Sequence, residues 1–99
     1  MSSLEVVPSK SERQAARSVV AEYHDAQLRR LVEHVADAID RYRAGDLTAF
    51  EVDHIFFQYS RAAKELWKFC SYLPVEVAAA GIREHPPSDW WERAAPRKR

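Results

Sequence analysis

Apolar residues between Ala16 and Tyr42 recur at alternating intervals of three and four, the spacing of one face of an α-helix. Ser9 followed by Glu12 matches a capping box at its start, and Gly45 is typical of the position just past a helix end. We therefore predict a helix over about residues 9–44. Its stripe consists of Ala16, Val20, Tyr23, His24, Gln27, Leu28, Leu31, Val35, Ala38, Ile39 and Tyr42.

A second stripe with the same periodicity follows Thr48 and Glu51, which match another capping box, and Pro74 marks its end. We predict a helix over residues 48–73. Because the connection between the two helices is short, they are expected to lie antiparallel as an αα-hairpin. The second stripe consists of Val52, Ile55, Phe56, Tyr59, Ala62, Ala63, Leu66, Trp67, Cys70 and Leu73.

The C-terminal part of the chain is less regular. Residues 75–80 are predicted to form a short helix closed by Gly81, and 88–95 a final short helix after the break at Pro86 and Pro87. Residues 1–8 are expected to be a disordered lead and 96–99 a basic tail. The predicted fold is all-α, with one helical domain over residues 9–95 in which the short helices pack across the hairpin.

Four aromatic residues of the second predicted helix fall outside its stripe: Phe50, Phe57, Phe69 and Tyr72. One neighbouring helix can cover only one face, so this surplus needs another cover. A C-terminal segment carrying Trp90 and Trp91 could fold over it, two hairpins could pair as a homodimeric four-helix bundle, or another protein could bind there. The sequence leaves all three interpretations open. The predicted interaction residues are Phe50, Phe57, Phe69, Tyr72, Trp90 and Trp91.

Composition narrows the class of protein. The 99 residues contain 15 Lys and Arg and 15 Asp and Glu, so the zero net charge favours neither nucleic acid nor an anionic membrane as a partner. The chain has one cysteine, no signal-peptide pattern and no membrane-spanning apolar run, which is typical of a cytoplasmic protein. The excess of Arg over Lys and the many alanines suggest a bacterial source.

Candidate chemistry is sparse, and no cofactor is predicted. Glu51 and His54 have the Glu-x-x-His spacing of di-iron helical bundles, and His24 lies in the first stripe, so these three residues are the weak metal-site candidates. Arg97, Lys98 and Arg99 are the weak nucleic-acid candidates, because two to four phosphate contacts bind only loosely. No set of residues predicts a catalytic site.

The sequence thus favours a small cytoplasmic protein–protein interaction module, such as an accessory, adaptor or partner-neutralising subunit. It would act through an aromatic helix face, as a dimer and with a possible second protein partner. The alternative is a small helical metal-binding protein or enzyme that uses His24, Glu51 and His54.

Overall fold

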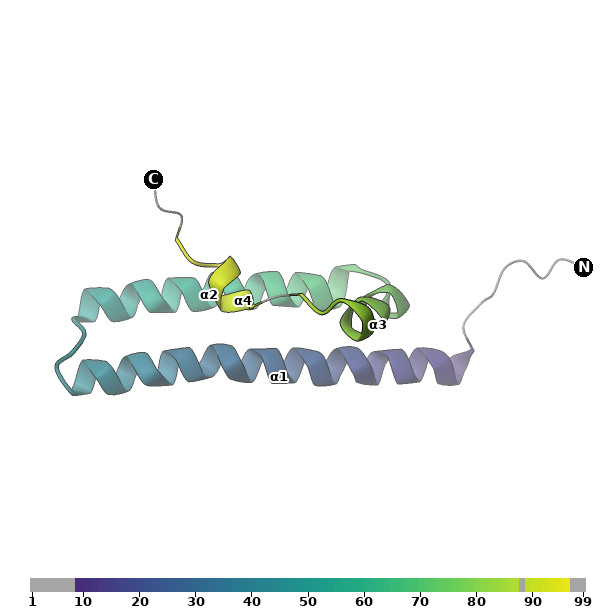
Figure 1. Cartoon of the computed structure of the whole chain (residues 1–99), viewed down its shortest axis with the longest axis horizontal. Coiled ribbons are helices and arrows are strands. Elements are labelled where there is room, and N and C mark those ends of the chain that lie inside the picture. The colour runs from purple at the N-terminus through teal and green to yellow at the C-terminus, as the bar shows by residue number, and fades with distance from the viewer. Residues whose placement is uncertain (1–8, 88, 97–99) are drawn as a thin grey trace, which may run out of the picture.

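The computed structural model describes residues 9–87 and 89–96, which form four α-helices and no strand. The helices are α1 (Lys10–Arg43), α2 (Ala49–Tyr72), α3 (Val75–Glu84) and α4 (Trp90–Arg93). The two long helices lie side by side and antiparallel, so the predicted all-α hairpin is present (Figure 1). The chain is elongated, at 69 × 29 × 18 Å.

Both long helices begin at the predicted capping boxes. The Ser9 hydroxyl accepts a hydrogen bond from the Glu12 amide, and the Glu12 carboxylate accepts one from the Ser9 amide, each at 3.1 Å. Thr48 and Glu51 repeat this arrangement at 3.1 and 2.8 Å. Because each box satisfies two otherwise unpaired donors, these local signals fix where α1 and α2 start. Gly45 has φ of +85°, which lets the chain turn between them.

The first turns of α1, up to Val20, pack mainly on α3, and Cys70 of α2 packs against the same contact. Ala16 and Val20 of α1 form a buried cluster with Ala78 and Ala79 of α3. The prediction that Gly81 ends this helix is wrong, because α3 continues to Glu84. Ile82 packs on the same cluster and extends the apolar face by a turn, which outweighs the roughly 1 kcal/mol that an interior glycine costs a helix.

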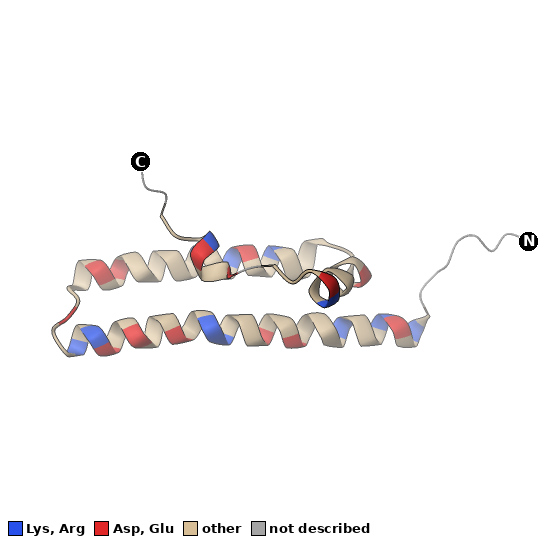
Figure 2. Ribbon diagram, in the orientation of Figure 1, with Lys and Arg blue, Asp and Glu red and all other residues tan. Residues whose placement is uncertain are grey.

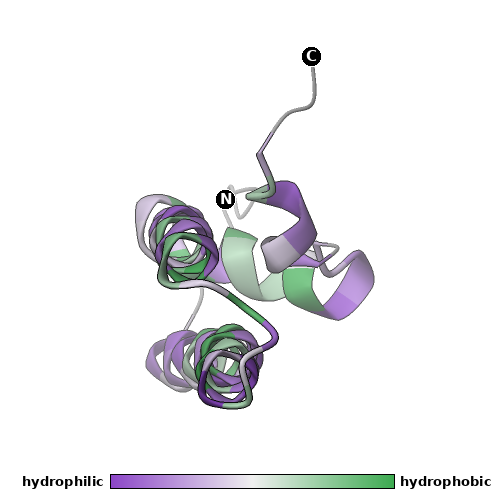
Figure 3. Ribbon diagram, turned by 90° about the vertical axis from the view of Figure 1, so that its left-hand side faces the viewer, coloured by the Kyte–Doolittle hydropathy of each residue, from purple (hydrophilic) through white to green (hydrophobic). Residues whose placement is uncertain are grey.

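The middle of the hairpin holds the larger core. Leu31 of α1 and Ala62 and Leu66 of α2 are buried together with Trp90 and Ala94 of the C-terminal segment. Seen end-on, α3 and α4 lie on one side of the α1–α2 pair (Figure 3). The fold is therefore a hairpin with one face covered by its own C-terminal segment.

Charged residues of both signs alternate along α1 and α2 (Figure 2). No helix of the described residues is long and apolar enough to cross a membrane. The predicted lead at 1–8, Ser88, and the tail residues Arg97, Lys98 and Arg99 lie outside the described residues.

Candidate interaction surface

One face of the hairpin is closed by Trp90. This side chain is 4% exposed, and its indole Nε1 donates a 2.7 Å hydrogen bond to the Tyr23 hydroxyl of α1. Phe69 of α2 packs against both rings, with centroid distances of 5.9 Å to Tyr23 and 5.6 Å to Trp90. Burial raises the pKa of the Tyr23 hydroxyl, an effect that the Trp90 hydrogen bond partly offsets. Trp90 therefore binds the C-terminal segment to both long helices.

Two side chains of α2 fasten the backbone of this segment. Gln58 Nε2 donates to the carbonyl oxygen of Trp91 at 2.9 Å, and Arg61 Nε donates to that of Ala94 at 3.0 Å. The Arg93 guanidinium lies 4.5 Å from the Trp90 ring centroid, a cation–π distance. The four-residue helix α4 is thus held by side chains of α2 as well as by its own backbone hydrogen bonds.

The opposite face of the hairpin is also apolar. Successive residues of a helix are about 100° apart around its axis. On both long helices, the residues of this face therefore lie about 100–180° around the axis from the residues that contact α4. Along each helix they follow one another at spacings of three, four or seven residues. We call this surface the open face, because no element among residues 9–87 and 89–96 lies over it. It consists of Leu28, Val32, Val35, Ile39 and Tyr42 of α1 and Ala49, Phe56, Ala63 and Trp67 of α2.

The larger side chains of the open face are half exposed. The exposed fractions are 47% for Val32, 49% for Tyr42, 43% for Phe56 and 50% for Trp67. Tyr42 and Phe56 line the same surface hollow, so the two helices present one continuous surface. Contiguous exposed apolar surface of this kind marks interaction sites on soluble proteins.

The six interaction residues predicted from the sequence fall into two groups. Phe50, Phe57 and Tyr72 are exposed at 82%, 58% and 67%, as expected of residues outside the α2 stripe. Trp90 lies instead in the hairpin core and offers no free surface, and Phe69 is partly buried against it. Trp91 is half buried and stacks on His34 with ring centroids 4.3 Å apart. The C-terminal segment thus covers Phe69 but leaves the other three aromatic residues of the surplus uncovered.

The periodicity of α2 predicts that Phe56 and Trp67 belong to the buried stripe, and the predicted stripe of α1 does not include Val32. The α2 stripe is too wide for one neighbouring helix, and these two residues lie at the edge that α1 does not reach. A signal for Val32 exists in the chain. Positions 28, 32, 35, 39 and 42 repeat the heptad spacing of a helix-packing seam, and Val32 interrupts the charged face of α1 at this spacing.

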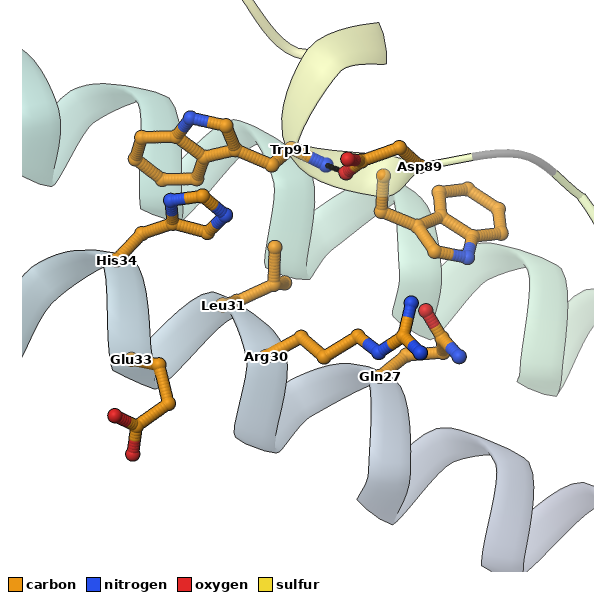
Figure 4. Close-up of a pocket in the computed structure, with 8 residues that line it drawn as sticks. Gln27, Arg30, Leu31, Glu33, His34, Asp89 and Trp91 are labelled. Carbon is orange, nitrogen blue, oxygen red and sulfur yellow. Dashed lines mark hydrogen bonds between the residues drawn. The ribbon is translucent and has the colours of Figure 1, made fainter.

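A shallow cavity of about 290 Å³ lies beside the stacked Trp91 and His34 rings (Figure 4). The Asp89 carboxylate at its rim accepts hydrogen bonds from the backbone amides of Trp91 and Glu92, so it caps α4. Glu33 points away from the stacked rings. The cavity thus holds no cluster of groups arranged for acid–base chemistry. It is lined by Gln27, Arg30, Leu31, Glu33, His34, Asp89, Trp90 and Trp91.

The metal-site candidates do not converge in one chain. The Glu51 carboxylate accepts the Thr48 amide in the capping box, whereas His54 is exposed and His24 lies near the other end of the hairpin. In the described part of the chain, no three His, Cys, Asp or Glu side chains are grouped so as to hold a metal ion. Burial raises the pKa of the Cys70 thiol to about 11, so this cysteine is protonated at neutral pH.

The chain was also compared with protein-family models, curated proteins and solved structures, and none of them matches it.

Proposed function

We propose that this chain is a small protein–protein interaction module that associates with further copies of itself through the surface of its helical hairpin. The observation that carries the proposal is the open face, where half-exposed Val32, Tyr42, Phe56 and Trp67 adjoin further apolar residues. A 99-residue domain has little apolar surface to spare, so leaving such a face in water works against its stability. Burial in an assembly removes this cost.

Two surfaces of α2 could be the site of association, and each contains one of the neighbouring residues Phe56 and Phe57. Phe56 belongs to the open face, whereas Phe57 points away from α1, on the same side of α2 as Phe50. Large aromatic side chains are the usual anchors of protein interfaces, so either side of α2 has the right composition. The open face is favoured because residues from two helices contribute to it.

The test compares Phe56→Glu with Phe57→Glu in the full chain, by sedimentation velocity over a concentration series. Both substitutions replace a phenylalanine of α2 by glutamate, and they differ only in the side of the helix that receives the charge. Each is therefore the matched control of the other. We expect the wild type and Phe57→Glu to associate and Phe56→Glu to remain at 11.4 kDa with its helicity unchanged.

The reverse pattern would move the interaction surface to the side of Phe50 and Phe57. A wild-type protein that stays at 11.4 kDa at every concentration, with both variants identical to it, would overturn the proposal. Loss of helicity in Phe56→Glu would also contradict it, since Phe56 would then belong to the core of the monomer.

A further inference from the structure

We infer that the open face receives the open face of a second copy of this chain, with α1 antiparallel to α1 and α2 antiparallel to α2 of the partner. The inference rests on the proposed function, since it gives the face and the arrangement through which the copies associate. The resulting assembly is a four-helix bundle with a twofold axis perpendicular to the helices. Three independent features of the chain agree on where that axis passes.

The first feature is the placement of the apolar residues on α1. Leu28 and Ile39 lie at equal distances from the point between residues 33 and 34, and so do Val32 and Val35. When α1 packs antiparallel on its own copy about this point, Leu28 meets Ile39 of the other chain and Val32 meets Val35. Each of these layers then contains two apolar side chains, as in a coiled-coil seam.

The second feature is the charge pattern at the edges of the open face. On α1, Asp25 and Arg29 form a 2.9 Å ion pair with each other within the chain. The symmetry places Asp25 opposite Arg43 of the second copy and Arg29 opposite Asp40, within about one residue of the same axis, which extends this ion pair across the contact. On α2, Asp53 and Lys64 are symmetric about the point between residues 58 and 59. In all three pairs the symmetry brings together opposite charges.

The third feature is that the two axis points lie at the same level of the hairpin. Tyr23 precedes the α1 point by the same number of residues as Phe69 follows the α2 point, and the two rings are in contact at 5.9 Å. At the other end, Tyr42 and Ala49 line one hollow and lie almost equally far from the two points. A single twofold axis therefore passes through the symmetry points of both helices. If the patterns on α1 and α2 were unrelated, these two points would not have to lie at the same level.

These features favour a second copy over an unrelated protein. Binding to an unrelated partner would not require any relation among the charges of this face. In a twofold dimer, each edge of the face lies against the same edge of the other copy, which runs in the opposite direction, so positive and negative residues must lie at symmetric positions. The covering helices α3 and α4 lie on the opposite side of the hairpin and leave the approach free. The zero net charge also adds no long-range repulsion between copies.

The test is charge reversal with rescue at Asp53 and Lys64. Within one chain these residues are eleven positions apart on α2, about 16 Å, so they do not pair with each other. Asp53→Lys alone and Lys64→Asp alone place like charges opposite each other at two symmetric sites, and each is expected to raise the dimer Kd about tenfold. The double variant restores opposite charges and is expected to return the Kd to within about threefold of the wild type.

The matched control is the exchange Glu65→Lys with Lys68→Glu. This pair forms a 3.3 Å ion pair within α2, away from the open face, so neither its single substitutions nor its exchange should alter the Kd. Circular dichroism checks that every variant keeps its helices.

Two results overturn the inference while leaving the proposed function intact. One is a dimer whose Kd is the same for the wild type and for all the Asp53 and Lys64 variants. The other is a Kd that rises in the single variants and is not restored in the double variant. A chain that is monomeric at every concentration overturns both the inference and the proposed function.

Discussion

The two faces of the α1–α2 hairpin are both apolar, yet only one is covered within the chain. On the covered face, Trp90 inserts between the helices and has a polar partner in Tyr23, while Gln58 and Arg61 bind the backbone of the covering segment. The open face carries Val32, Phe56 and Trp67 without any such covering segment in the described residues. The contrast separates residues that stabilise the monomer from residues that are free to bind another molecule.

The largest effect that this contrast predicts is at Trp90. Trp90→Ala removes a 4% exposed indole that contacts both long helices, so we expect the free energy of unfolding to fall by about 3–5 kcal/mol. Urea titration followed by circular dichroism measures it, at one fixed protein concentration because association adds to apparent stability. Trp91→Ala, which removes a half-buried ring stacked on exposed His34, is the control and should cost clearly less. Equal losses at the two positions would contradict the account.

A comparison inside α2 sharpens the same point. Leu66 is 0% exposed and Phe57 is 58% exposed. We expect Leu66→Ala to cost about 2–5 kcal/mol. Phe57→Ala should stay within about 0.5 kcal/mol, although it removes a larger side chain. The same urea titration measures both variants, and a strongly destabilised Phe57→Ala would place that residue in the fold rather than on its surface.

The hydrogen bond between Trp90 and Tyr23 gives a smaller effect. Tyr23→Phe keeps the ring against Phe69 but leaves the buried indole N–H of Trp90 without its acceptor, which should cost about 1–3 kcal/mol. The control is Tyr42→Phe on the open face, which removes a hydroxyl from a side chain that is 49% exposed and should be nearly neutral. Thermal melts of the two variants, run side by side, distinguish them.

The smallest expected effect is alkaline destabilisation through Cys70. Burial holds the pKa of the folded thiol at about 11, above its ordinary value of 9.0. The contribution of the thiol to the free energy of unfolding is therefore fully present below pH 9 and is lost as the pH rises toward 11. In Cys70→Ala this part of the pH dependence should disappear, while the part due to Tyr23 remains. Melting temperatures between pH 8 and 11 measure it. A melting curve that keeps the same pH dependence without the thiol would contradict the assignment.

The long helices were predictable because their signals are local. The capping boxes at Ser9 and Thr48 and the short connection containing Gly45 define both starts and the antiparallel arrangement without reference to tertiary contacts. The extent of α3 was not predictable in the same way. Gly81 is typical of a helix end, but the packing of Ile82 on α1 carries the helix past it.

The candidate site was predicted only in part, for a physical reason. The sequence shows that α2 has more apolar surface than α1 can cover, but the angle at which α1 and α4 approach α2 decides which residues remain free. That angle packs Phe69 against the core, partly buried, and leaves Phe56 and Trp67 half exposed, the opposite of what the periodicity of α2 alone indicates. Which aromatic residues of α2 are covered becomes clear only from the position of Trp90, which packs against both long helices.

The most direct test of the central claim, that a second copy occupies the open face, is one interchain distance. A spin label at Ser60, introduced as Ser60→Cys in a Cys70→Ala background, lies close to the inferred axis on α2. Helices packed 8–10 Å apart, with a short axial offset, predict a label-to-label distance below about 20 Å by pulsed electron paramagnetic resonance. A distance above about 30 Å, or no dipolar coupling at concentrations where the protein is dimeric, would contradict the account.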